Sequence, residues 1–357
     1  MTNSIYQNNK PDLNTGYKPT PEPGKYESSL MLNSAEVGNL WSQYLWDSMA
    51  VCFLQHFAEN VEDPDIQSAI EYALKVSQKH TVKIRDIFTA ENIPVPVGFT
   101  HEDFHQKAPR LFSDSVYLHY LSYMGKNGMM LYAQIMSMCT RSDIRDFYSM
   151  CLDSSRELDN KTLEILQSKG LYIRPPFMAE GAEVDFVEKK SFLGSFWGSD
   201  RPLHALEASH MFYNIQRNVL GKTILSGLVQ VTQSDIIRDY FMKGIEIAHK
   251  HIEIFSSLLE KSNLPATTDW EIEITDSTTP PLSDKIMLYH TTFLIPVSTS
   301  FYSAAIGVSN RKDLTASYAR LIAEVLKYAG EGINIMIDNG WMEEPPQAGG
   351  RYNLTVH

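Results

Sequence analysis

One short stretch of the sequence has the spacing of a metal-binding helix. Glu207 and His210 stand three residues apart in the run Glu-Ala-Ser-His, so on an α-helix their side chains share a face. Carboxylate and imidazole together form a ligand set that iron, manganese or zinc accepts. His251 lies on the apolar face of another predicted helix, at the same end of the predicted bundle. We therefore predict a transition-metal site (iron, manganese or zinc) at Glu207, His210 and His251.

These histidines also have a simpler interpretation. His251 and its counterpart His80 interrupt apolar helix faces, where a histidine is commonly a core residue with one hydrogen-bond partner. His80 has Asp47 and Asp143 as candidate partners. A second Glu-x-x-His run, at 246–249, lies opposite the apolar face of its helix and indicates a solvent-exposed surface.

A third chemistry is the binding of a ligand by an apolar interior. One predicted helix is dense in tyrosine and methionine, at Tyr117, Tyr120, Tyr123, Met124, Met129 and Met130. Such residues most simply fill a core, and they could also line a pocket for a hydrophobic ligand. Arg217, which follows His210 on the same predicted helix, could pair with an acid inside the bundle or bind the carboxylate of a ligand.

The elements that must position these residues occur twice. The sequence repeats at an interval of 170 residues, as in the pairs Ser113 and Ser283, Arg141 and Arg311, and Gly170 and Gly340. His80 and His251 match at an interval of 171 instead. This change of interval has two explanations. Either one residue is inserted in the second half, which a helix can absorb as a π-turn, or the match of Asp65 with Asp235 is one residue out of register.

At the interval of 170, Val37 and Leu40 occupy the positions of Glu207 and His210. The predicted metal site would then exist only in the second half of the chain. A complete di-iron site in a four-helix bundle takes carboxylates from two helices and Glu-x-x-His from the other two. Neither half supplies that set, which argues against ferroxidase or di-iron oxygenase chemistry.

Each half is predicted to contain four helices. In the first half, Ser34 is the expected N-cap of the first helix, Asp63-Pro64 begins the second, and the fourth follows Arg141 and ends at Gly170. Helices of the second half begin near Leu206, Ser234, Ser283 and Asn310. Connections are short within each helix pair and long between pairs, which is typical of a crossover bundle. The predicted fold is all-α, with two tandem ferritin-like four-helix bundles.

The same patterns divide the chain into five parts. These are an arm at 1–29, a first bundle at 30–173, a connector at 174–203, a second bundle at 204–344 and a tail at 345–357. The arm is rich in Asn, Pro, Gly and Lys and has no signal pattern, which predicts disorder. The connector carries several aromatic residues, so we expect it to pack along a bundle.

The composition argues against several classes of function. The net charge is −12, and a nucleic-acid partner is not expected because phosphate binding needs a basic face. No apolar run reaches the roughly 18 residues of a membrane helix, so no membrane partner is predicted. The 3 cysteines lack the spacing of a zinc site or a disulfide framework, which fits the cytoplasm. A protein partner or a homo-oligomer is compatible with these features.

Five stretches carry a resemblance to a known family: SAEVGNLWSQY (34–44), APRLFSDS (108–115), ILQSKGLYIRPP (165–176), HKHIEIFSSLL (249–259) and IMIDNGWMEEPPQA (335–348). They resemble an uncharacterised family of duplicated ferritin-like four-helix-bundle proteins from spore-forming Gram-positive bacteria, known as a domain of unknown function. Some single-bundle relatives are labelled spore-coat proteins, so the resemblance implies a spore-associated role by analogy. It supplies no catalytic residues.

Three functions follow as hypotheses. The first is a non-enzymatic structural or interaction protein, cytoplasmic and spore-associated, because neither half holds a complete catalytic site. The second is a metal-binding protein or oxidoreductase with one site in the second bundle. The third is a carrier of a hydrophobic small ligand.

Overall fold

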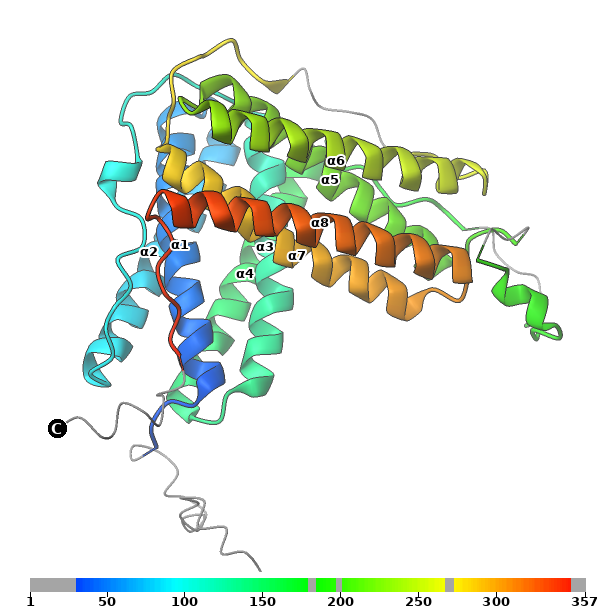
Figure 1. The fold of residues 1–357 in the computed structure, drawn as a ribbon, viewed down its shortest axis with the longest axis horizontal. Coiled ribbons are helices and arrows are strands. Elements are labelled where there is room, and N and C mark those ends of the chain that lie inside the picture. The colour runs from blue at the N-terminus through cyan, green and yellow to red at the C-terminus, as the bar shows by residue number, and fades with distance from the viewer. Residues whose placement is uncertain (1–29, 179–183, 197–200, 267–272, 348–357) are drawn as a thin grey trace, which may run out of the picture.

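The structure, a computed structural model, describes residues 30–178, 184–196, 201–266 and 273–347 (Figure 1). Its helices are α1 (Ser34–Asn60), α2 (Pro64–Ala90), α3 (Asp114–Met138), α4 (Ser142–Ser168), α5 (Ala205–Val231), α6 (Asp235–Glu260), α7 (Asp284–Val308) and α8 (Lys312–Asp338). Two 3₁₀ turns are η1 (His101–Asp103) and η2 (Lys190–Leu193). Within these ranges no β-strand forms and β-structure is limited to isolated bridges, so the all-α prediction is confirmed.

Side-chain caps fix the starts of several helices. Ser113 and Ser283 each accept a backbone N–H from the first turn of α3 and of α7. The cap of α1 is Asn33 rather than the predicted Ser34, because the side-chain oxygen of Asn33 accepts the N–H of Glu36 at 3.0 Å. The sequence therefore placed the start of α1 one residue late.

Each half of the chain forms its own four-helix bundle. α1 and α2 form one hairpin, α3 and α4 form a second, and residues 91–113 cross between the two hairpins. α5–α8 repeat this connectivity. The two bundles lie crosswise, with α1 and α3 against α5 and α7 (Figure 1). The predicted duplicated bundle architecture is confirmed, and its ferritin-like character stays a prediction.

Each crossover holds the start of the other half's third helix. The carbonyl of Asp103 accepts the backbone N–H of Ser283 at 3.0 Å, and its carboxylate accepts the hydroxyl of Ser283 at 2.7 Å. Glu273 makes the same two contacts with Ser113. Two antiparallel bridges also join the crossovers, Phe104 to Leu282 and Phe112 to Ile274. Because every contact recurs 170 residues later with the halves exchanged, an approximate two-fold axis relates the bundles.

The interval between the halves is 171 residues in their first two helices. Ile66 is buried in the first bundle, and the buried residue at its place in the second is Ile237, whereas Ile236 is 68% exposed. The sequence match of Asp65 with Asp235 is therefore one residue out of register. Both α2 and α6 are α-helical throughout their bounds, so no π-turn accounts for the change of interval.

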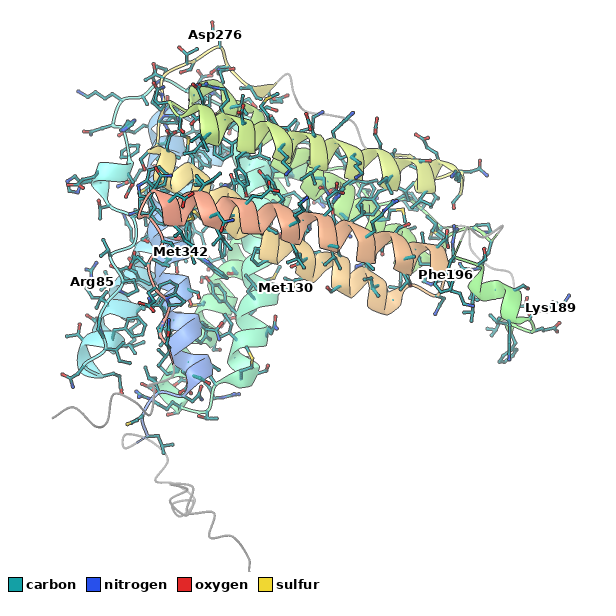
Figure 2. The ribbon with its side chains drawn as sticks, in the orientation of Figure 1. Arg85, Met130, Lys189, Phe196, Asp276 and Met342 are labelled. Carbon is teal, nitrogen blue, oxygen red and sulfur yellow. The ribbon has the colours of Figure 1, made fainter. Side chains whose placement is uncertain are left out.

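Residues 177–178 and 184–196 of the connector are not packed along a bundle, which corrects the prediction for that stretch, whereas Leu203 at its end is buried in the second bundle. Phe177 is 83% exposed and Phe186 is 82% exposed. Lys189 and Phe196 lie on a segment that projects beyond the end of the second bundle (Figure 2). The aromatic side chains of this segment therefore do not contribute to either core. The predicted arm, 1–29, and most of the predicted tail lie outside the described residues.

By length and composition alone, α7 could cross a membrane. A single helix of this kind is weak evidence, because the core helices of globular proteins have the same properties. In the structure α7 packs against α5 and α8. The absence of a membrane partner stays a prediction.

Candidate functional site

The predicted metal ligand Glu207 is a structural carboxylate. Its oxygens accept the backbone N–H groups of His204, Asn310 and Arg311 at 3.0–3.2 Å, and a two-pronged ion pair from Arg201 at 2.9 and 3.0 Å. Burial alone would raise the pKa of Glu207, but the hydrogen bonds from Arg201 and the backbone lower it. Glu207 therefore joins the starts of α5 and α8, and its oxygens are already occupied.

The first bundle contains an equivalent structural carboxylate, Glu36, which joins the starts of α1 and α4. Its carboxylate accepts the backbone N–H groups of Asn33, Thr140 and Arg141 at 2.8–2.9 Å. At the interval of 171, Glu36 stands where Glu207 stands, and Asn39 stands where His210 stands. The assignment of Val37 and Leu40 to these positions is wrong, and the carboxylate is not confined to the second half.

The three predicted ligands do not come together. His210 is half-buried, and burial together with the charge of Arg217 lowers its pKa. His251 is fully buried, with Nδ1 2.9 Å from the hydroxyl of Tyr302 and Nε2 3.2 Å from Glu324. Among the described residues no three His, Cys, Asp or Glu side chains are grouped so as to hold a metal ion. The predicted site is therefore not formed, because Glu207 and His251 are each committed to other partners.

His80 and His251, which occupy equivalent positions of the repeat, belong to a polar layer in the middle of each bundle. In the first bundle Nδ1 of His80 lies 3.2 Å from Asp47, and Gln43 also donates to Asp47 at 3.2 Å. Burial is the largest influence on the pKa of His80 and would lower it, but the charge and hydrogen bonding of Asp47, together with Cys151, outweigh burial and raise the pKa to about 10. In the second bundle Asn218 stands in place of Asp47, and burial lowers the pKa of His251.

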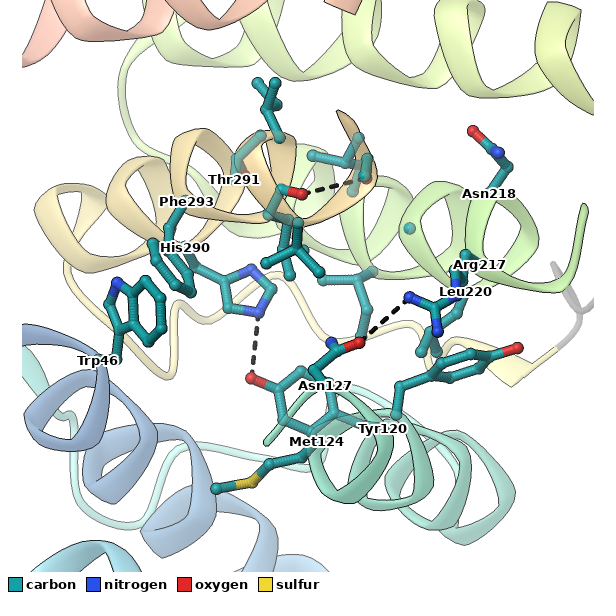
Figure 3. A pocket seen from close by; sticks show the side chains of 18 of the residues that line it. Trp46, Tyr120, Met124, Asn127, Arg217, Asn218, Leu220, His290, Thr291 and Phe293 are labelled. Atoms are coloured by element: carbon teal, nitrogen blue, oxygen red, sulfur yellow. Dashed lines mark hydrogen bonds between the residues drawn. The ribbon is translucent and has the colours of Figure 1, made fainter. Parts of the chain in front are cut away.

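A cavity of about 250 Å³ lies where the two bundles meet, and we call it the central cavity. α1 and α3 line it from the first half, and α5 to α8 line it from the second. Its walls are largely apolar and include Trp46, Tyr120, Met124, Leu220, His290 and Phe293 (Figure 3). Both halves of the duplicated chain thus contribute to this cavity.

Equivalent residues of the two halves meet across this cavity. Tyr120 and His290 are 170 residues apart, and the Tyr120 hydroxyl lies 3.1 Å from Nε2 of His290 (Figure 3). The ring of Trp46 packs on that of Phe293 with a centroid separation of 3.8 Å. On the other side Arg217 occupies the position of Trp46, and its guanidinium lies over the ring of Tyr123.

Sequence reasoning identified part of this wall. The Tyr- and Met-rich helix was predicted as a core or as a pocket lining, and Tyr120 and Met124 do line the central cavity. Arg217 was identified as a cation inside the bundle. The role of His290 and Phe293 was missed, and a signal existed, since each stands 170 residues after a tyrosine of α3.

Comparison with known proteins assigns no activity. No curated protein matches the chain. A solved structure of a putative spore coat protein from Bacillus halodurans aligns with a TM-score of 0.39 and 18% identity, covering 42% of this chain and 98% of that one. A likeness of this size carries no functional argument. The family described as "protein of unknown function (DUF3231)" matches twice, over residues 24–184 and 191–354, and the chain belongs to this family.

Proposed function

We propose that this protein binds a small, largely apolar molecule in the central cavity. The observation that carries the proposal is the combination of volume and lining: about 250 Å³ with mostly apolar walls at the junction of the two bundles. A closely packed interior rarely leaves such a space. A protein cavity of about 150 Å³ lined by apolar side chains binds benzene, so this one suits a molecule of roughly ten non-hydrogen atoms.

The position of the cavity supports the same proposal. It lies between the bundles, where ligand sites of helical proteins commonly occur. Its deepest polar group, His290, is only 1% exposed, and burial lowers the pKa of its ring to about 4, so the ring is neutral near pH 7. The wall therefore offers mainly apolar surface with a few polar groups, among them the uncharged hydrogen-bonding pair Tyr120 and His290.

A cavity-filling variant tests this proposal. Gly221 lines the cavity, and a Cβ added there meets no atom within 4 Å, so Gly221→Leu should begin its side chain in open space and fill part of the cavity. Gly330, which is exposed on α8 and also has open space around it, gives the matched control Gly330→Leu. The measurement is titration calorimetry with octan-1-ol, a neutral ligand of suitable size.

We expect octan-1-ol to bind the wild type and Gly330→Leu with equal affinity, and to bind Gly221→Leu at least tenfold more weakly. Both substitutions also replace a helical glycine, which favours the helix by up to about 1 kcal/mol, so loss of binding would not reflect unfolding. No binding to the wild type, or equal binding to both variants, would refute the proposal.

A non-enzymatic structural or interaction role, spore association and a cytoplasmic location stay predictions from the sequence. The same holds for a protein partner or a homo-oligomer. Ligand binding in the central cavity is compatible with each of them.

A further inference from the structure

We propose that the ligand of the central cavity carries a carboxylate and that the guanidinium of Arg217 binds it. This inference rests on the proposed function and specifies the chemical class of the ligand. It would make the protein a binder of small amphipathic acids, with one anionic group and an apolar remainder.

The side chain of Arg217 has an unused hydrogen-bonding edge inside the cavity. Nη1 donates to the side-chain oxygen of Asn127 at 3.1 Å (Figure 3). The guanidinium lies against the rings of Tyr123 and Phe301. Nε is buried and has no hydrogen-bond partner among the described residues. The edge formed by Nε and Nη2 is the one that fits the two oxygens of a carboxylate.

The charge of Arg217 is not balanced by the residues around it. Burial lowers its pKa to about 10, and the ionisable groups that raise the pKa in return are three tyrosines, Tyr123, Tyr213 and Tyr302, rather than an acid. Even so, the guanidinium is cationic at neutral pH. The Arg217 side chain is half-buried and its guanidinium lacks a counter-ion, so an anionic ligand would reduce the cost of this partial burial.

The other charged residue in the wall does not supply the missing anion. Asp47 also lines the central cavity, but its carboxylate faces His80, whose pKa is raised to about 10. The Asp47–His80 pair is therefore neutral overall near pH 7. Among the described lining residues this leaves Arg217 as the one uncompensated charge, and the cavity carries a net charge of about +1.

The test compares three probes that share an eight-carbon chain and differ in charge: octanoate, octan-1-ol and octylamine. Each is titrated into the full chain at pH 7 by calorimetry. The variants are Arg217→Met, which keeps an unbranched side chain without charge, and Arg217→Lys, which keeps the charge without the two-pronged edge. Arg156→Met, on the exposed face of α4, is the matched control.

We expect the wild type and Arg156→Met to bind octanoate about tenfold or more tightly than octan-1-ol, and octylamine most weakly. Arg217→Met should lose the preference for octanoate and keep its affinity for octan-1-ol within about twofold, which also shows that it is folded. Arg217→Lys should show an intermediate preference.

If octan-1-ol binds but octanoate binds no tighter, the carboxylate inference is wrong and the proposed function stands. The same conclusion follows if Arg217→Met keeps the preference for octanoate. If none of the three probes binds the wild type, the proposed function itself is refuted, and the carboxylate inference with it.

Discussion

The hydroxyl of Tyr120 and Nε2 of His290 lie 3.1 Å apart at the contact between the two bundles, and the two residues occupy equivalent positions of the repeat. Their rings are stacked, with centroids 5.7 Å apart. The second ring nitrogen of His290, Nδ1, has no partner among the described residues. The contact between the bundles is therefore centred on a histidine that is buried in its neutral form.

This burial predicts a loss of stability in weak acid. Burial lowers the pKa of His290 and of His56 to about 4, against 6.5 for a free ring. The unfolded chain therefore binds protons first, so the stabilisation is fully present above pH 6.5 and is lost as the pH falls toward 4. Each ring contributes roughly 3 kcal/mol to this loss.

The substitution His290→Phe should flatten the dependence of unfolding free energy on pH between 6.5 and 4, while lowering stability at pH 8 through the lost hydrogen bond. Urea unfolding at a series of pH values measures both effects. His249→Phe, at an exposed position of α6, should leave the slope unchanged. An unaltered slope in His290→Phe would show that this ring is not one of the buried titrating groups.

The reciprocal crossover contacts predict matched losses in the two halves. Asp103→Ala and Glu273→Ala each remove hydrogen bonds to a serine that caps the other half's third helix. Each substitution should cost about 1–2 kcal/mol of unfolding free energy. Glu102→Ala, at the exposed neighbouring position, should have little effect. A loss in only one of the two variants would contradict the two-fold relation.

Glu207 and Glu36 are predicted to act on stability and not on metal content. Glu207→Gln removes the negative charge from a buried two-pronged ion pair with Arg201 and should cost about 3–5 kcal/mol. Glu36→Gln weakens bonds from backbone N–H groups and from the Thr140 hydroxyl but breaks no ion pair, so it should cost less, about 1–3 kcal/mol. Chemical unfolding and metal analysis of the same samples check both statements.

Acid should remove the contribution of the Glu36 and Glu207 carboxylates to the free energy of unfolding. The pKa of each carboxyl is lowered below 4.5, so the stabilisation is present above that pH and disappears as the pH falls through the folded-state pKa. A Glu207→Gln protein as stable as the wild type but depleted of bound metal would overturn the structural role.

Asp47 should control the charge of His80. In the second half Asn218 stands in place of Asp47, and burial lowers the pKa of His251 even though Glu324 lies beside it. Asp47→Asn should accordingly move the pKa of His80 from about 10 to below 6.5. Titration of the ring carbon signals by NMR measures the shift, with Asp143→Asn as a control outside this layer.

The pair of Asp47 and His80 in the wild type also predicts that the free energy of unfolding depends on pH in the alkaline range. Because the folded-state pKa of His80 is raised, the stabilisation is fully present below pH 6.5 and is lost as the pH rises through about 10. Asp47→Asn should remove that alkaline loss. A His80 pKa that does not respond to the substitution would exclude Asp47 as its cause.

Local patterns predicted the helices well, and a single fixed interval misassigned the first-half counterparts of Glu207 and His210. Ser113 and Ser283 marked helix starts correctly because capping depends on residues within one turn. The interval of 170 failed in the first two helices because it was based on matching residue types, Asp65 with Asp235. The pattern of buried positions gives an interval of 171 there. The correct interval of 171 has a local signal in the sequence. Asn33 and Glu36 form a capping box at the start of α1, and His204 and Glu207 form one at the start of α5.

The central cavity could not be predicted from the sequence because no single helix or bundle contains it. Its wall requires the contact between bundles, and that contact depends on the pairing of two crossovers with little regular structure. Trp46 and Arg217 look unrelated in the sequence, and only the interval of 171 shows that they are equivalent.

The substitution of Arg217 for Trp46 has a consequence that two separate identical chains could not achieve. Around a strict two-fold axis, every wall residue would appear twice, so the space would hold either two like charges that repel or two indoles. Fusing the halves into one chain gives the space two unlike ends, one cationic and one aromatic (Figure 3). Such a space has a direction, and an elongated guest would enter it in a single orientation.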